Sequence, residues 1–511
     1  MINISDNNKR IAKNTLLLYG RMAIMLVVGL FTSRVVLAAL GIRDYGIYNV
    51  VGGVVSLFAV LTGAMSITTS RFLTYTLGEG DKRKLSVTFS TSVNVHILLG
   101  VGIAVLMEVL GVWFLNTHLN VPKERMWAAN WVLQFSILTF VINLINVPYT
   151  SIIISHERMN IYAYLSLFDV FVKLGIVYAL YVTPYDRLIT YSIFLCASNL
   201  LVQILYYVYC KRSFEECTYH FIVDKPLLKE MFEFIGWTFW GNAAVTAKDQ
   251  GVTILLNIFF GTTVNAAQGV ATQVNGVVNR FIQNFMTAVD PQITKFYSMN
   301  DRDNMYKLIF RSAKFSAFLM LVLISPILMH VNSILGVWLV EVPEHAANFV
   351  CLVLIYSLIE CMLNPLITAL LASSKIKAYE ILITITYSLN ILSIYLLFKI
   401  GSFPEMAIIL NIVFKLIVLG ILSNQCKRNF SFPAQKYFKK VVGIAALISC
   451  LSIVMIVVYK NVVTKTTIPS FIVSCILMEM ILLSFMYIFG MESNERIFIK
   501  NIINNKILKR K

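Results

Sequence analysis

The chain has 511 residues, of which 58% are hydrophobic and only 14% are charged. Soluble domains are about 45–50% apolar and about 25% charged, so this composition excludes a string of ordinary soluble domains. The net charge is +17, but nucleic-acid binding is not expected, because the basic residues lie in short loops between apolar runs and not in a soluble basic domain.

About fourteen apolar segments follow one another, each long enough to cross a bilayer as a helix. The first six are predicted at 14–40, 45–70, 87–115, 126–155, 161–181 and 188–210. The next six are predicted at 231–260, 263–290, 308–339, 345–373, 378–397 and 405–423, and the last two at 441–458 and 468–489. The prediction is an all-α integral membrane protein.

The loops on one side of the predicted bundle contain several times more Lys and Arg than those on the other. The poorer side carries only Arg43, Lys123, Arg125, Arg187, Lys399, Lys460 and Lys465. The richer side is therefore predicted to be cytoplasmic, and an even number of spans places both termini there. The polar, basic segment 1–13 does not fit a cleavable signal peptide.

The chain contains an internal repeat. An offset of 217 residues aligns Pro148 with Pro365 and Arg158 with Lys375, and an offset of 220 aligns Gly41 with Gly261. Two matches at nearly one offset indicate duplication of a six-span unit. Because six is even, the copies share one orientation and are predicted to form two pseudo-symmetric lobes around a cavity, as in transporters that alternate access to a midplane site.

The repeat predicts four parts of the chain. These are an N-terminal six-helix lobe at 1–210, a cytoplasmic linker at 211–230, a C-terminal six-helix lobe at 231–426, and two extra helices with a basic tail at 427–511. The prolines Pro148 and Pro365 should kink their helices. Such kinks could gate transport or be purely structural.

Ionisable residues inside the spans cost about 2.5–3.5 kcal/mol each at mid-bilayer, so they are expected to face a cavity or a partner. The basic ones are Arg21, Arg34, Arg71, Lys173, Lys248, Arg280 and Lys415. The acidic ones are Glu108, Asp169, Asp249, Asp290 and Glu360. Those near the cytoplasmic ends, which are Arg21, Arg71 and Asp290, could simply extend to the interface.

The surplus of basic residues favours an anionic ligand. Arg34 and Arg280 lie well inside their spans and have no opposite charge at helical spacing. Since arginine binds phosphate through two parallel donors, we take Arg34, Arg280, Lys248 and Arg21 as candidate substrate-binding cations. The alternatives are internal ion pairing or solvation in the lumen.

Four further residues are candidates for ion coupling or for counter-charges. Asp169 and Lys173 are four apart and can pair on one helix face. The neighbours Lys248 and Asp249 point about 100° apart and are not expected to face each other. Glu360 lies one turn before Pro365, where a kinked backbone could expose carbonyls to a cation.

A row of amides follows one predicted helix, and its members are Asn130, Gln134, Asn143 and Asn146. These side chains could form hydrogen bonds between helices or contact a sugar. No phosphate-binding loop, zinc-binding HExxH motif or CxxC pair occurs in the sequence. The chain is therefore predicted to be neither an enzyme nor a binder of a metal or cofactor.

Two segments carry a resemblance to a known family: Asn14-Thr-Leu-Leu-Leu-Tyr-Gly-Arg21 and Leu40-Gly-Ile-Arg-Asp-Tyr-Gly-Ile-Tyr48. With the region of Asp249 and the turns at Arg158 and Lys375, they make the chain similar to the Wzx-type polysaccharide flippases. These flippases are grouped with multidrug and toxin extrusion (MATE) proteins and lipid II flippases in one exporter superfamily.

The resemblance implies a MATE-like fold and a place in the bacterial cytoplasmic (inner) membrane. It implies transport of undecaprenyl-pyrophosphate-linked oligosaccharide units from the inner to the outer leaflet, by alternating access through a cationic central cavity. The product would feed O-antigen (lipopolysaccharide) or capsule biosynthesis, with a polysaccharide polymerase as a candidate partner.

Three alternatives stay open. A MATE-like drug/cation antiporter would have the same fold, but its cationic substrates would favour an acidic cavity. A lipid II flippase would differ in being essential to the cell. A membrane polysaccharide polymerase or glycosyltransferase belongs to another class and typically carries a large outer loop, whereas the longest outer loop predicted here has about ten residues.

Overall fold

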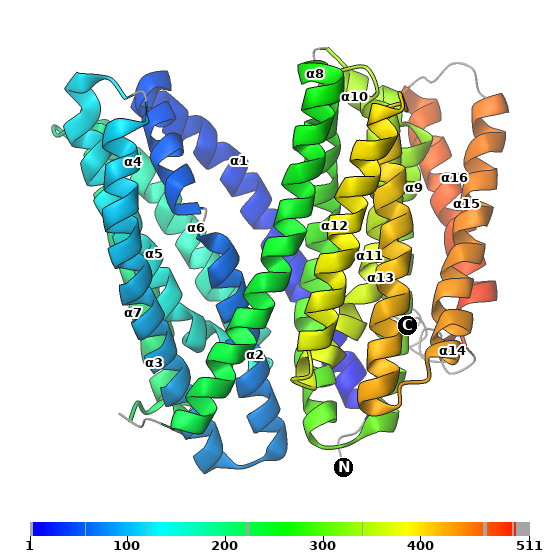
Figure 1. Cartoon of the computed structure of the whole chain (residues 1–511), viewed down its shortest axis with the longest axis horizontal. Coiled ribbons are helices and arrows are strands. Elements are labelled where there is room, and N and C mark those ends of the chain that lie inside the picture. The colour runs from blue at the N-terminus through cyan, green and yellow to red at the C-terminus, as the bar shows by residue number, and fades with distance from the viewer. Residues whose placement is uncertain are drawn as a thin grey trace, which may run out of the picture. The chain divides into compact units, whose positions relative to one another are not determined.

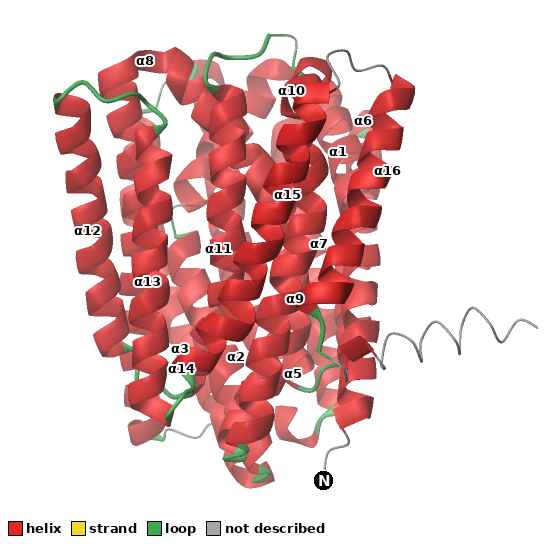
Figure 2. Cartoon of the chain, turned by 90° about the vertical axis from the view of Figure 1, so that its right-hand side faces the viewer, coloured by secondary structure: helices red, strands yellow, loops and turns green. Residues whose placement is uncertain are grey.

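The computed structural model describes residues 4–56, 58–119, 121–220, 224–339, 341–462, 468–492 and 495–496. Within these residues every regular element is a helix (Figure 2). The chain forms two compact units. Unit 1 comprises Met1–Ala243 and Thr287–Asp301, and unit 2 comprises Ala244–Met286 and Arg302–Lys511.

Unit 1 holds the first seven helices and both ends of the eighth (Figure 1). They are α1 (Ile4–Ser56), α2 (Ala59–Glu79), α3 (Lys82–Leu106), α4 (Val112–Thr117), α5 (Met126–Ser155), α6 (Met159–Val182), α7 (Arg187–Ser213) and α8 (Lys225–Ser298). Helix α5 is central in this unit, because it packs against α2, α3 and α7, while α1 packs against α6.

Unit 2 holds the middle of α8 and all later helices. They are α9 (Arg302–Met329), α10 (Val331–Trp338), α11 (Ala346–Ala372), α12 (Lys377–Lys399), α13 (Met406–Phe430), α14 (Ala434–Tyr437), α15 (Gly443–Val462) and α16 (Ile468–Phe485). Here α11 is central and packs against α9 and α13. Helices α5 and α11, which carry the two prolines aligned by the repeat, are thus the central ones, and each continues through its proline, Pro148 or Pro365.

The described residues contain 12 candidate membrane spans. This number counts the 74-residue helix α8 once, although it is broken at Gly261, and it omits the less apolar stretch 42–79. Dividing α8 and adding that stretch gives the predicted fourteen. The chain is therefore an all-α, multi-pass membrane protein, and many large apolar side chains on its outer helices, such as Ile472 and Ile476 of α16, are exposed as a bilayer requires.

The two longest helices are each broken at one glycine. Gly41 in α1 has φ 76° and ψ 166°, and Gly261 in α8 has φ 81° and ψ −170°. This region of backbone space is essentially closed to residues with a Cβ atom. The two glycines are the pair that the internal repeat aligned, so the same backbone break occurs once in each copy.

Other local features recur at the repeat offset and support the duplication. The Cys210 thiol donates to the Tyr149 carbonyl at 3.5 Å, and the Cys426 thiol donates to the Leu366 carbonyl at 3.7 Å. The turn residues Glu157 and Ser374 both have φ 59°. Gly80 and Asn300, which follow α2 and α8, also share a positive φ.

Candidate functional site

A cluster of charged and aromatic side chains lies inside unit 2. Lys415 of α13 places its Nζ 2.8 Å from Glu360 Oε1 of α11, and its side chain is buried. The same ammonium lies 4.8 Å from the centre of the Tyr356 ring, one turn before Glu360 on α11. A carboxylate and a cation–π contact therefore both stabilise Lys415 in the protein interior.

Lys248 of α8 joins this cluster from another side. Its Nζ lies 3.5 Å from the Tyr356 hydroxyl and 5.4 Å from the centre of the Tyr387 ring of α12. It also lies 2.7 Å from Asp249 Oδ1. The expectation that these neighbours do not face each other is wrong. Their Cβ atoms do point apart, but the flexible four-carbon stem of lysine lets the ammonium reach its neighbour's carboxylate.

The third predicted lysine is paired too. In α6, Lys173 Nζ lies 2.7 Å from Asp169 Oδ2, as their spacing of four residues predicts. Each lysine singled out inside the spans therefore has a carboxylate partner. The carboxylates of Asp169, Asp249 and Glu360 each balance one of these lysines, which fits the role of counter-charge.

The arginines inside the spans differ from the lysines. Arg71 is buried in unit 1, 3.9 Å from Glu230 Oε1 and against the Phe72 and Tyr75 rings. Arg21 lies over the Tyr162 ring at 4.5 Å and donates to Ser166 Oγ at 3.3 Å.

Arg34 of α1 and Arg280 of α8 are exposed. Arg34 belongs to unit 1 and Arg280 to unit 2. Among the described residues, Arg21, Arg34 and Arg280 form no ion pair. The surplus of positive charge predicted from the sequence thus consists of three arginine guanidinium groups.

Unit 1 contains a cavity of about 430 Å³ beside the Asp169–Lys173 pair. Its wall combines aromatic rings from Tyr48, Phe135, Phe140 and Tyr191 with polar groups. The polar groups belong to Ser136, Thr139, Asn143, Lys173, Ser192 and Asn199. Aromatic faces beside amides and hydroxyls form a surface that can hold a polar ring-shaped ligand.

The cavity in unit 1 and the charged cluster in unit 2 occupy equivalent positions of the repeat. The cavity residues Thr139, Asn143, Lys173 and Asn199 correspond, at offsets of 217 or 216, to Tyr356, Glu360, Asn390 and Lys415. At these positions unit 1 has an open polar cavity in which Lys173 is paired with Asp169, whereas in unit 2 Lys415 and Glu360 pair with each other. Of the polar residues in this cavity, Asn143 and Lys173 were singled out from the sequence, whereas Ser136, Thr139, Ser192 and Asn199 were missed.

Two further carboxylates within helices were missed. Glu380 of α12 is buried, and both side-chain oxygens of Glu479 in α16 are buried without a hydrogen-bond partner among the described atoms. Glu479 lies in a strongly apolar segment, and a search for single charges in the last predicted span would have found it. Within the described residues, neither carboxylate forms an ion pair with Lys248 or Lys415.

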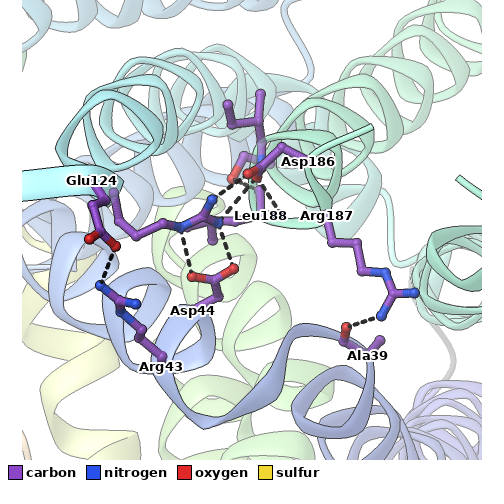
Figure 3. Close-up of polar contacts among 10 residues, drawn as sticks. Ala39, Arg43, Asp44, Glu124, Asp186, Arg187 and Leu188 are labelled. Atoms are coloured by element: carbon purple, nitrogen blue, oxygen red, sulfur yellow. Dashed lines mark hydrogen bonds and ion pairs between the residues drawn. The ribbon is translucent and has the colours of Figure 1, made fainter. Parts of the chain in front are cut away.

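An ion-pair network fixes the backbone beyond Gly41 at one end of unit 1 (Figure 3). Arg125, just before α5, donates from Nε to Asp44 Oδ1 at 3.0 Å and also binds Asp186. Asp186 caps α7 by accepting from the Leu188 and Ile189 amides. Partial burial alone would raise the pKa of Asp186, but its hydrogen bonds from Arg125 and these amides outweigh burial and lower it.

Unit 2 has a comparable bridge before α11 and α13. His345 Nδ1 lies 2.7 Å from Glu405 Oε1, and the Asn348 amide donates to the same oxygen at 2.8 Å. Partial burial would raise the pKa of Glu405, but these hydrogen bonds from Asn348 and His345 lower it. Arg125 links the loop before α5 to the loop before α7, and His345 links the equivalent loops before α11 and α13.

In the described part of the chain, no group of three or more His, Cys, Asp or Glu side chains could hold a metal ion.

Comparison with protein families identifies one match. The MatE family model matches residues 11–179, which all lie in unit 1. A comparison with curated proteins finds no match.

Solved structures match over most of the chain. An outward-facing multidrug resistance MATE family transporter of the MOP superfamily superposes with a TM-score of 0.72 at 11% identity, covering 84% of this chain and 97% of its own. A MOP superfamily transporter from Pyrococcus furiosus, described as having a binding pocket of reverse polarity, has a TM-score of 0.68 at 12% identity and covers 82% and 96%. A MATE protein in the bent conformation has a TM-score of 0.67 at 13% identity and covers 83% and 97%. The chain thus has the MATE fold.

Proposed function

We propose that the chain is a transporter that moves undecaprenyl-pyrophosphate-linked oligosaccharide units from the inner to the outer leaflet of the bacterial cytoplasmic membrane. Both termini would lie in the cytoplasm, and the product would supply surface polysaccharide biosynthesis. One observation carries the proposal: Arg21, Arg34 and Arg280 form no ion pair among the described residues, whereas the lysines singled out inside the spans are all paired.

The kind of basic residue left without a carboxylate matters for the ligand. A guanidinium group is planar and presents parallel donors that match two oxygens of one phosphate group. An ammonium group acts as a point charge and is easily balanced by a single carboxylate. Among the basic residues singled out inside the spans, those without an ion pair in the described residues are therefore of the type that recognises phosphate or diphosphate groups, and Arg34 and Arg280 are the exposed ones.

The unit 1 cavity supplies a second element of substrate recognition. Sugars present apolar ring faces and a rim of hydroxyl groups, and the cavity offers Tyr48, Tyr191 and phenylalanine rings beside the amides of Asn143 and Asn199. We assign one sugar residue of the oligosaccharide to this cavity. The neighbouring Lys173 is balanced by Asp169, so the wall is polar with little net charge, as a neutral sugar would require.

The three carboxylates predicted as candidates for ion coupling are paired, which favours a flippase over an antiporter that would use them to bind cationic drugs. A cationic substrate or coupling ion needs an acidic group that is not already neutralised. Asp169, Asp249 and Glu360 each have a lysine ammonium within 2.8 Å. Each carboxylate is therefore already neutralised by a lysine of the protein and does not need a free cation. In this proposal these carboxylates are counter-charges, and Gly41 and Gly261 permit the bends needed for alternating access.

The test uses a strain that lacks this gene, complemented with wild type, Arg34→Ala or Arg43→Ala. Mass spectrometry of lipid-linked glycans and staining of surface polysaccharide are the two readouts. We expect lipid-linked repeat units to accumulate and surface polymer to disappear in the deletion strain. Wild type should restore both, and Arg34→Ala should not.

Arg43→Ala is the matched control, because Arg43 is also an exposed arginine of α1 and its ion pair within the described residues is with exposed Glu124. It should complement like wild type. Unchanged lipid-linked glycans together with reduced efflux of a cationic dye would replace the flippase with the antiporter. Loss of viability on deletion, with lipid II accumulating inside, would point to a lipid II flippase.

A further inference from the structure

A basic pocket lies at the predicted cytoplasmic end of unit 1, away from the residues assigned to transport above. It has a volume of about 360 Å³ and forms where α1 meets the turn between α5 and α6. Its polar lining includes Arg10, Lys13 and Asn14 from α1, and Arg158 and Asn160 from the turn and the start of α6.

The acidic residue of this pocket, Glu157, does not neutralise Lys13 or Arg158. Glu157 has a side chain only 1% exposed. It is paired with Arg10 Nε at 2.8 Å and with Lys295 Nζ at 2.8 Å, and it accepts a hydrogen bond from Gln292. Its charge is therefore fully balanced inside the protein by two basic groups.

The other acidic residue nearby is turned to a different partner. Glu216 is paired with His156 Nε2 at 2.5 Å, and the His156 ring is stacked on Phe214. Partial burial would raise the pKa of Glu216, but its hydrogen bond from His156 outweighs this effect and lowers it. Lys13 and Arg158, by contrast, are exposed and have no carboxylate partner among the side chains that the structure describes.

The pocket is preorganised by the turn that forms its floor. Glu157 has φ 59°, a left-handed conformation that is unfavourable for a residue with a side chain. The ion pairs of its carboxylate and a hydrogen bond from the Asn14 amide to its carbonyl, at 3.4 Å, hold it there. Arg158 and Asn160 are therefore presented from a fixed backbone, and α6 begins at Met159 without a side-chain cap, so its positive end adds to the local field.

We propose that this pocket binds a diphosphate group, with Lys13 and Arg158 as its principal ligands and Asn160 as a hydrogen-bond donor. The inference rests on the proposed function and deepens it: the pocket is the first capture site for the diphosphate of the lipid-linked substrate, on the side where that substrate is made. Transport then requires transfer of the diphosphate from this pocket to the arginines inside the spans.

The experiment measures binding of inorganic pyrophosphate by calorimetry to the full-length protein in phosphatidylcholine nanodiscs. The double variant Lys13→Gln with Arg158→Gln should bind at least about tenfold more weakly than wild type, because it loses two charge-assisted contacts. The charge-conserving variant Lys13→Arg with Arg158→Lys should retain most of the affinity. A matched control, Arg83→Gln with Lys439→Gln, removes two other exposed basic residues and should bind like wild type.

Two results would overturn the inference. One is a double glutamine variant that elutes as a single folded species and binds pyrophosphate like wild type. The other is loss of pyrophosphate binding when the nanodisc contains phosphatidylglycerol. In that case the pocket holds an anionic lipid headgroup and not the substrate. Undecaprenyl pyrophosphate should compete with pyrophosphate, and phosphatidylglycerol should not.

The outcomes also separate this inference from the flippase proposal. If the glutamine variant binds normally while gene deletion still blocks surface polysaccharide, the pocket assignment fails and the flippase stands. If the variant loses pyrophosphate binding while deletion leaves lipid-linked glycans unchanged, the flippase fails and the pocket remains a diphosphate site.

Discussion

At the scale of single residues, pairing decides which charges inside the membrane can meet a ligand. Sequence spacing identified the basic surplus and predicted the Asp169–Lys173 pair correctly. It could not predict that Lys248 reaches Asp249 or that Lys415 reaches Glu360, because the first depends on a side-chain rotamer and the second on packing of α13 against α11. Helical spacing had already marked Arg34 and Arg280 as lacking an opposite charge, and the structure adds that the lysines are all paired.

The Lys415–Glu360 pair gives a prediction for stability. Lys415→Met should lower the free energy of unfolding by about 3 kcal/mol, because it leaves a carboxylate without its partner in the interior of unit 2. The double variant Lys415→Met with Glu360→Gln removes both charges and should recover most of the loss. Thermal unfolding in detergent measures both, and a double variant as unstable as Lys415→Met alone would contradict the pairing.

At the scale of secondary structure, the apolar segments predicted the helices well, but not how they join. The chain was expected to have loops at 41–44 and 261–262, whereas α1 and α8 continue through these positions with a single break at Gly41 and Gly261. A hydropathy pattern marks where a helix is apolar, and it carries no information on whether a short polar connection is helical. The aligned glycines were the one signal of these breaks.

The glycine breaks give a prediction with an internal control. Gly41→Ala should destabilise the protein by about 1–3 kcal/mol, because alanine is strained at φ 76° and ψ 166°. No atom lies within 4 Å of the position of an added Cβ, so the cost comes from the backbone and not from a clash. Gly46→Ala, in the same helix with an ordinary helical backbone and equally open surroundings, should be neutral or stabilising.

Unfolding temperatures in detergent compare the two variants, and the same experiment on Gly261→Ala tests the second copy. An unfolding temperature for Gly41→Ala equal to that of Gly46→Ala would show that the break is not required. A transport defect in Gly41→Ala without a loss of stability would place the break in the transport cycle.

At the scale of the whole molecule, duplication connects the fold to the proposed site. The repeat was visible in the sequence at Pro148 and Pro365, and the structure repeats it in the Cys210 and Cys426 hydrogen bonds. What could not be predicted is the divergence of the copies, in which one keeps a polar cavity and the other an ion pair. That difference depends on side-chain volume and pairing in three dimensions.

The central claim is that arginines inside the membrane recognise the diphosphate of a lipid-linked oligosaccharide during its transfer between leaflets. Its most direct test reconstitutes the purified protein in liposomes that contain undecaprenyl-pyrophosphate-linked oligosaccharide and measures the glycan exposed on each leaflet over time. We expect wild type and Arg43→Ala to equilibrate the glycan between leaflets, and Arg34→Ala and Arg280→Ala to slow this transfer at least about tenfold. Equal transfer rates for wild type and both inner-arginine variants would contradict it.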